Sequence, residues 1–195
     1  MVVTLSLESS SPQCSWALLE GDDVRAHGAT LERASGGFFA SLTGAWPAGT
    51  RPNQILVGVG PGSFSGVRVA IAAALGMARA WNCPVIPVRS THALGRLYPE
   101  EEWLGVFSDA KRGQVFYTSY RRGRMAEASR LVPRAELGPT AARCTLAVAL
   151  GPLEGLSQAV CPSAAELARA WKDGGAEPAL ALEPVYLHET VVASA

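Results

Sequence analysis

The chain has 195 residues, enough for one compact domain or two small lobes whose core needs no metal or disulfide. Hydrophobic residues make up 48% of the sequence and charged residues 17%, which excludes the composition of disordered chains. Seventeen basic residues balance seventeen acidic ones, so the basic excess of a dedicated nucleic-acid binder is missing. If the protein works near RNA, we expect another molecule to hold the RNA.

The four cysteines stand far apart, at Cys14, Cys83, Cys144 and Cys161. They form neither a CxxC pair nor the framework of a small secreted protein, so free thiols are expected. The first residues lack the pattern of a signal peptide, and no segment reaches the roughly 18 apolar residues of a membrane span. We therefore expect a cytoplasmic soluble protein without membrane contact.

The first half of the chain alternates strands and helices. Segments 2–7, 14–19 and 24–31 predict a three-stranded meander. A glycine-rich helix at 35–46 follows, then a buried strand at 55–59, a helix at 67–81, a second buried strand at 85–88 and a short helix that ends at Leu97. The order βββαβαβα, with strands that need covering on both faces, predicts an α/β lobe.

The acidic patch at 100–102 is the best boundary between two lobes. It divides the chain into an N-terminal lobe at 1–99 and a smaller C-terminal lobe at 100–195. Strands are predicted at 103–108, 114–121 and 145–150, and Ser163 begins a helix to Lys172 through a capping box. Residues 184–188 are typical of a short extended segment.

A glycine-rich loop at 60–66 lies between a buried strand and a helix N-terminus, where backbone N–H groups favour an anion. The candidate anion or nucleotide residues are Gly60, Gly62, Ser63, Ser65 and Gly66. The loop lacks the lysine of a Walker A motif, and its glycines miss the dinucleotide fingerprint. A tight turn that needs glycine backbone angles explains the loop equally well.

The helix at 67–81 is apolar on all sides, with only Arg68 and Arg79 charged. A helix of this kind is buried on all sides, yet the chain has little sequence left to cover the side away from the sheet. Its small side chains permit the close approach of a second helix, so we expect a partner surface built from this helix and the preceding one. The alternative is that the preceding helix covers it internally. The expected contacts are Phe38, Phe39, Leu42, Val67, Ala70, Ile71, Ala74 and Met77, with Arg68 at the edge.

Catalytic constellations are missing from the sequence. His27, His92 and His188 stand too far apart for a metal-binding helix face and are expected at the surface or in turns. Glu8 and Asp109 end predicted strands and are the candidate cleft carboxylates, although such residues more often cap turns. No metal site is expected.

The loop and the residues after it read GPGSFSGVR from Gly60 to Arg68. They resemble the GPGSFTGVR signature of the TsaB (YeaZ) family, the scaffold subunits of bacterial tRNA threonylcarbamoyladenosine synthesis. Four further stretches agree in the same order. LESSS from Leu7 resembles LDTST, CSWAL from Cys14 resembles CSVAL, DAKRGQVF from Asp109 resembles DARxGEVY, and PVYL from Pro184 resembles PVYLR.

The resemblance implies an actin-like (ASKHA) two-lobe fold with a reduced second lobe. It also implies a non-catalytic subunit that pairs through its first two helices with TsaD, the metal-dependent catalytic paralogue. A P-loop ATPase subunit, TsaE, would join the complex, and tRNA would be contacted indirectly. The resemblance implies no cofactor beyond weak nucleotide binding at a subunit interface, and it implies a homodimer in isolation.

Four positions depart from the family's pattern: Glu8 replaces Asp, Ala34 replaces His, Lys111 replaces Arg and His188 replaces Arg. The alternative function is an ATP-dependent phosphotransferase or peptidase-like enzyme of the actin-like superfamily that uses Glu8 and the glycine loop on ATP. A third hypothesis is a homodimer that buries the same two helices against themselves.

Overall fold

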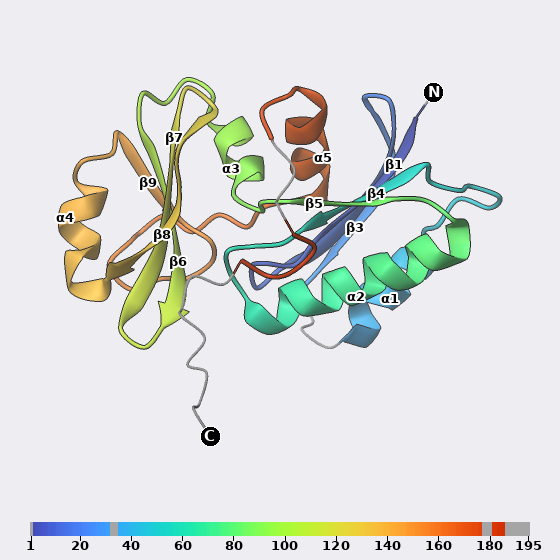
Figure 1. Ribbon diagram of the computed structural model, residues 1–195, viewed down its shortest axis with the longest axis horizontal. Coiled ribbons are helices and arrows are strands. Elements are labelled where there is room, and N and C mark those ends of the chain that lie inside the picture. The colour runs from blue at the N-terminus through green and yellow to red at the C-terminus, as the bar shows by residue number, and fades with distance from the viewer. Residues whose placement is uncertain (1, 32–34, 177–180, 186–195) are drawn as a thin grey trace.

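The computed structural model describes residues 2–31, 35–176 and 181–185, with an α/β arrangement around two separate sheets (Figure 1). Ala34, Tyr186, Leu187 and His188 lie outside the described residues, so the expectations for them are not addressed. No helix within the described ranges is long and apolar enough to cross a membrane.

The first sheet has five strands in the order β3-β2-β1-β4-β5. They are β1 (Val3–Glu8), β2 (Cys14–Glu20), β3 (Asp23–Thr30), β4 (Gln54–Gly58) and β5 (Val85–Val88). Strand β1 pairs antiparallel with β2 and parallel with β4. These strands confirm the five segments predicted in the first half of the chain.

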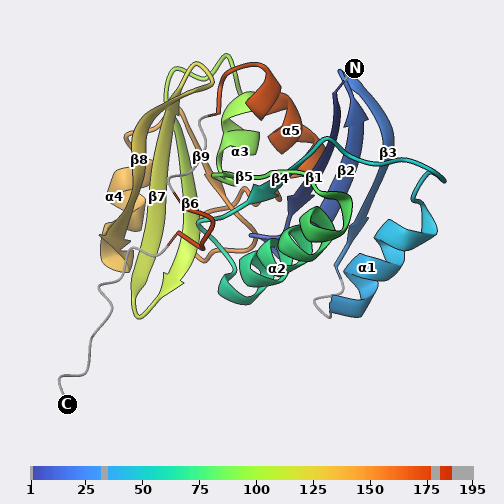
Figure 2. The same ribbon diagram turned by 45° about the vertical axis from the view of Figure 1, so that its right-hand side comes forward.

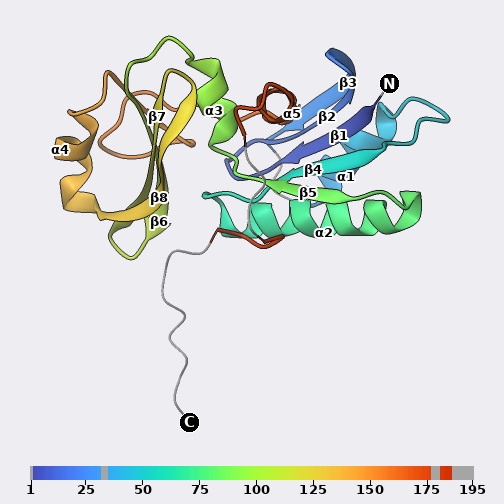
Figure 3. The same cartoon turned by 45° about the horizontal axis from the view of Figure 1, so that its top comes forward.

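Two pairs of helices cover the two faces of this sheet. Helices α1 (Ser35–Gly44) and α2 (Phe64–Trp81) pack against one face, where Leu5 and Leu7 belong to their core. Helix α5 (Ala164–Lys172) lies on the other face beside α3 (His92–Leu97). Figure 3 shows α2 and α5 on opposite sides of the sheet. Side chains alternate along β1, so Ser6 and Glu8 point away from α2.

The second sheet has four strands in the order β8-β7-β6-β9. They are β6 (Leu104–Lys111), β7 (Gln114–Arg121), β8 (Arg124–Pro133) and β9 (Leu146–Ala149). The 3₁₀ turn at Arg134–Glu136 and helix α4 (Leu137–Ala141) lie against the face that carries Phe107 and Tyr117. Strands β6, β7 and β9 confirm three predictions, whereas β8, the 3₁₀ turn and α4 were not predicted.

Buried polar and apolar contacts join the two sheets, which lie side by side in Figure 2. The Tyr120 hydroxyl on β7 donates a hydrogen bond of 2.8 Å to Thr91 Oγ1, and Leu94 packs beside Tyr120. Helix α5 returns from the second sheet to the first, where Ala164 N donates to Ser15 Oγ. Helix α5 thus lies after the predicted division at residue 99, yet its apolar side is buried against the first sheet.

Candidate partner interface

Helix α2 has a buried side and an open side. Val67, Ala70 and Ala74 are buried in the core with β1 and β4. The exposed residues recur every three or four positions on the opposite side: Phe64, Arg68, Ala72, Leu75, Gly76 and Arg79. We call this set the open face. Phe64 is 55% exposed and Leu75 is 50% exposed, so the open face includes two large apolar side chains.

The expected contact residues differ from this open face. Six of the nine are buried inside the chain itself: Phe38, Leu42, Val67, Ala70, Ile71 and Ala74. Their side chains contact the chain's own core, and their assignment to a partner interface stays a prediction. Met77 is half-buried against the same core, whereas Phe39 and Arg68 are exposed.

The sequence did carry a signal for the open face. Arginine is almost never fully buried without a charged partner, so Arg68 and Arg79 mark the side of the helix that faces water. Phe64, Ala72 and Leu75 follow at helical spacing on that side. The pattern is hard to recognise in the sequence, because small apolar residues of α2 itself occur on all sides of the helix.

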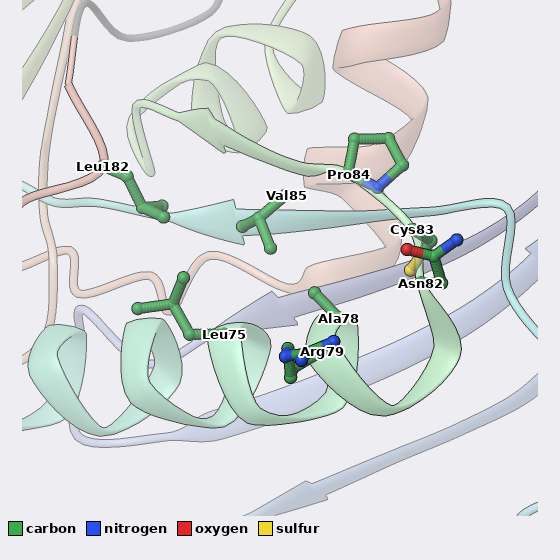
Figure 4. A pocket seen from close by; sticks show the side chains of 8 residues that line it. All are labelled: Leu75, Ala78, Arg79, Asn82, Cys83, Pro84, Val85 and Leu182. Atoms are coloured by element: carbon green, nitrogen blue, oxygen red, sulfur yellow. The ribbon is translucent and has the colours of Figure 1, made fainter.

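A pocket of about 560 Å³ adjoins the open face at the C-terminal end of α2. Its lining is about equally polar and apolar, and it includes one guanidinium, one amide and one thiol (Figure 4). The residues are Leu75, Ala78, Arg79, Asn82, Cys83, Pro84, Val85 and Leu182. Because Leu75 and Arg79 belong both to the pocket and to the open face, the two form one continuous surface.

Two tryptophans hold the segment after α1 against the end of α2. The rings of Trp46 and Trp81 stack with centroids 5.0 Å apart and an interplanar angle of 12°. Trp46 also donates through Nε1 to the carbonyl of Thr50 at 3.2 Å. The stack fixes the two helices on the same face of the sheet, so their outward sides form a single surface.

The glycine loop is occupied by the chain's own 9–11 segment. Ser63 N donates to Ser10 O at 2.6 Å, and Ser9 Oγ donates to Gly66 O at 2.6 Å. The amides of Gly60 and Gly66 bond to the hydroxyls of Ser90 and Ser63, whereas the exposed Ser65 lies outside this network. The amides of Gly60, Ser63 and Gly66 are thus bonded within the chain, which favours the tight-turn explanation over the phosphate loop.

The Glu8 carboxyl is completely buried at the end of β1. Its Oε1 accepts a hydrogen bond from Ser10 N at 2.6 Å, whereas Oε2 makes no hydrogen bond of ordinary geometry with the described residues. Gly58 on β4 gives Oε2 its space, since a Cβ there would lie 1.9 Å from it. Burial raises the pKa of Glu8, and hydrogen bonds from Ser10 and Ser90 oppose the rise only in part. A carboxyl held in this way is a structural group that favours its neutral form.

We expect Glu8→Gln to stabilise the protein at neutral pH and not at acidic pH. The unfolded carboxyl ionises above its ordinary pKa of 4.5, while the folded carboxyl keeps its proton to a higher pH. The free energy of unfolding of the wild type therefore falls as the pH rises from about 4.5 towards the higher pKa of the folded carboxyl. The glutamine variant does not ionise, so its stability does not fall for this reason. We expect the free energy of unfolding to rise by about 1–3 kcal/mol at pH 8 and to change little at pH 4.

Urea unfolding at both pH values measures this difference, with exposed Glu136→Gln as the matched control. The comparison is between variant and wild type at each pH, because burial and the nearby Arg89 also lower the pKa of His92 to about 4. An equal gain at pH 4 and pH 8 would contradict the raised pKa of Glu8.

Asp109 lies near the end of β6 in the second sheet, whereas Glu8 ends β1 in the first. It follows Phe107 by two positions on β6, so both side chains lie on the face that α4 covers. Lys111 Nζ pairs with Asp109 Oδ2 at 2.6 Å, and Arg134 approaches Oδ1 at 3.9 Å. These cations lower the pKa of Asp109. Asp109 is thus a strand residue in an ion pair, and its role as a cleft carboxylate together with Glu8 stays a prediction.

His92 is buried instead of lying at the surface or in an open turn. It is 3% exposed, its ring packs edge-on to Tyr120 at 5.8 Å, and its Nε2 has no partner among the described residues. The expectation of a surface residue failed because the second sheet covers α3. Within the described ranges, no three His, Cys, Asp or Glu side chains gather where they could hold a metal ion.

The two sheets, their strand orders and the helices that cover them define a two-sheet α/β fold. Solved structures share this fold over nearly the whole chain. YeaZ from Pseudomonas aeruginosa matches with a TM-score of 0.73 and 23% identity, covering 96% of this chain and 100% of that one. A second structure, described as similar to peptidase YeaZ from Pseudomonas aeruginosa, matches with a TM-score of 0.72, 25% identity and the same coverage.

The sequence comparisons match parts of the chain. A family model described as TsaD, tRNA N6-adenosine threonylcarbamoyltransferase, matches residues 48–137. The Escherichia coli protein named tRNA threonylcarbamoyladenosine biosynthesis protein TsaB is 29% identical over 126 residues, 60% of this chain and 54% of that protein. An uncharacterized protein of Mycobacterium leprae is 34% identical over 101 residues, 52% of this chain and 27% of its own length. The chain thus spans about half or less of the curated relatives it matches.

The chain is thus similar in fold to YeaZ and, over part of its length, similar in sequence to TsaB, in agreement with the resemblance of its GPGSFSGVR segment.

Proposed function

We propose that the chain is a non-catalytic scaffold subunit for the N6-threonylcarbamoyladenosine modification of tRNA, and that it binds and activates a TsaD-type catalytic subunit. The E. coli relative carries the biosynthesis of this nucleoside in its name. The observation that carries the scaffold role is the open face of α2, on which Phe64 and Leu75 are half exposed and Leu75 adjoins a pocket. Exposed apolar surface of this kind marks sites of protein association.

The surroundings of the candidate catalytic groups support a subunit without chemistry of its own. Glu8 is enclosed by the chain, the glycine loop is bonded to the 9–11 segment, and Asp109 is paired with Lys111. Burial, backbone hydrogen bonds and an ion pair thus engage the groups that the alternative function would use on ATP.

The further partners follow from the same proposal. A TsaE-type P-loop ATPase would join the complex, and tRNA would be held through the catalytic subunit. We assign no cofactor to the chain, and weak nucleotide binding at a subunit interface stays a prediction.

Reconstitution with purified components tests the proposal. We expect modified tRNA only when this chain, a TsaD-type subunit and a TsaE-type ATPase are all present with a threonylcarbamoyl donor, and none from this chain alone. The chain alone is also expected not to bind Mg-ATP in isothermal titration. Two results together would support the phosphotransferase or peptidase-like alternative. They are micromolar Mg-ATP binding by the isolated chain and tRNA modification that proceeds when this chain is left out.

A further inference from the structure

Three arginines surround the turn between β7 and β8. Arg121 ends β7, Arg122 and Gly123 make the turn, and Arg124 begins β8. The φ angles of Arg122 and Gly123 are 48° and 76°, two positive values of the kind that a type I′ hairpin turn requires. The turn therefore holds Arg121 and Arg124 directly opposite each other on one face of the sheet, with their Cβ atoms about 5 Å apart.

An acidic side chain neutralises only one of these three arginines. Arg122 pairs with Glu102 at 3.2 Å, whereas neither Arg121 nor Arg124 forms an ion pair with an acidic side chain of the described residues. Like charges that stand directly opposite each other destabilise a hairpin. The fold thus maintains a repulsion between Arg121 and Arg124 that a bound anion would relieve.

Aromatic rings order the guanidinium groups on this side of the sheet. The Arg121 guanidinium lies 4.2 Å from the centroid of the Trp103 ring, and that of Arg130 lies 4.9 Å from the Tyr117 centroid. Trp103 also donates through Nε1 to the Tyr117 hydroxyl at 3.2 Å, so the two stacks are joined. A stacked guanidinium keeps its in-plane N–H donors available for phosphate oxygens. We call Arg121, Arg124 and Arg130, with the two rings, the basic face.

The basic face exposes no apolar anchor for a protein. Its charge is only partly offset, because Glu127 pairs with Arg130 at 3.9 Å and leaves Arg121 and Arg124. None of the exposed large apolar side chains among the described residues belongs to β6, β7 or β8; they are Val2, Leu31, Phe39, Phe64, Leu75 and Leu97. The centre of a protein–protein interface is typically apolar, whereas nucleic-acid interfaces are polar, positively charged and bonded mainly to phosphates. The composition of the basic face therefore favours a nucleic acid.

We propose that the basic face binds the phosphate backbone of RNA, so that this chain contacts the tRNA itself in addition to the contact through the catalytic subunit. The proposal rests on the proposed function only in naming tRNA as the RNA. A formal charge of zero over the whole chain opposes a dedicated nucleic-acid binder but permits a short contact with a few phosphates. Strand β8 and helix α1 lie at opposite ends of the molecule (Figure 2), so a partner on α1 and α2 and an RNA on the basic face would occupy different sides.

Fluorescence anisotropy of a labelled, unmodified tRNA transcript, titrated with the isolated full chain, tests the proposal. We expect a dissociation constant of about 10–100 μM in about 50 mM NaCl, rising at least about tenfold in about 200 mM NaCl. The double variant Arg121→Ala, Arg124→Ala should bind at least about tenfold more weakly, and its salt slope should fall by about 2. The matched control is Arg68→Ala, Arg79→Ala, which removes the same charge from exposed positions of α2 and should bind tRNA as the wild type does.

A thermal measurement examines the repulsion across the turn without RNA. Arg124→Glu replaces that repulsion by attraction to Arg121, so the midpoint of thermal unfolding should rise by about 1–3 °C. The same variant should bind tRNA more weakly than the wild type, because a carboxylate repels phosphate. A lower midpoint together with unchanged tRNA binding would overturn the proposal.

Unchanged tRNA binding by the double variant of the basic face would also overturn it, as would an equal loss in the α2 control. Poly-glutamate that bound as tightly as tRNA would overturn it in favour of an acidic protein. In the reconstituted modification reaction, the double variant of the basic face should raise the KM for tRNA about tenfold and leave kcat unchanged. If the chain bound tRNA as expected but the complete mixture modified none, the scaffold function alone would fail. If the chain bound no tRNA and modification proceeded with an unchanged KM, the RNA contact alone would fail.

Discussion

Leu75→Arg is expected to abolish co-purification with a TsaD-type subunit while leaving the chain folded, whereas Ala74→Arg is expected to unfold it. The two residues are adjacent but point about 100° apart around α2. Leu75 is 50% exposed at the rim of the pocket, and Ala74 is 0% exposed in the core. An arginine at 75 blocks the pocket from outside, and an arginine at 74 must displace core side chains or bury an unpaired charge.

The expected magnitudes separate the two effects. Loss of a central apolar anchor should weaken partner binding by at least about 100-fold, or roughly 3 kcal/mol. Burial of an unpaired guanidinium at position 74 should cost about 4 kcal/mol or more of stability. Thermal unfolding followed by circular dichroism and a pull-down of the purified partner measure both quantities. If Leu75→Arg bound the partner normally, the open face would not be the interface. If Ala74→Arg remained folded and lost binding, the interface would lie on the side that the structure buries.

The uniform apolar character of α2 explains two outcomes. The helix could be predicted from the sequence, but most of the contact residues predicted on it lie on its buried side. Hydrophobic periodicity locates a buried face only where polar residues mark the other one. In α2 the only charged residues are Arg68 and Arg79, and alanines occur on both the buried and the open side. Which alanines meet the sheet depends on the pairing of β1 with β4, a contact between segments about 50 residues apart.

The second lobe was harder to predict for two reasons. In strand β8, apolar and polar residues alternate only weakly, and Glu127, Ala128 and Arg130 are exposed along the edge of the sheet. The strand therefore shows neither the alternation nor the apolar run that predicts a strand. Helix α5 was predicted from its Ser163 cap, and the structure confirms that Ser163 Oγ accepts from Glu166 N. Its return to the first sheet, and the burial of His92 that the second sheet causes, depend on long-range packing that local patterns do not contain.

The glycine loop was the feature on which sequence reasoning was evenly divided, and Gly66→Ala distinguishes the two explanations. A Cβ at Gly66 would lie 2.1 Å from the carbonyl oxygen of Ser9, a backbone atom that cannot rotate away. The bond from Ser9 Oγ to Gly66 O holds the same two segments together. We therefore expect the variant to lose about 2–4 kcal/mol of stability, because the loop must separate from the 9–11 segment to make room.

Gly76→Ala is the matched control in the same helix, since a Cβ there meets nothing within 4 Å. Alanine restricts the unfolded chain and favours the helix, so this variant should gain about 0.5–1 kcal/mol. Guanidinium unfolding of both variants and the wild type gives the two differences. A loop built to open around an anion would tolerate Gly66→Ala with little loss of stability, and phosphate would then raise the wild-type melting temperature. A loop that closes on its own chain loses stability on substitution and does not respond to phosphate, because Ser10 and Ser9 already fill the space that the anion would need.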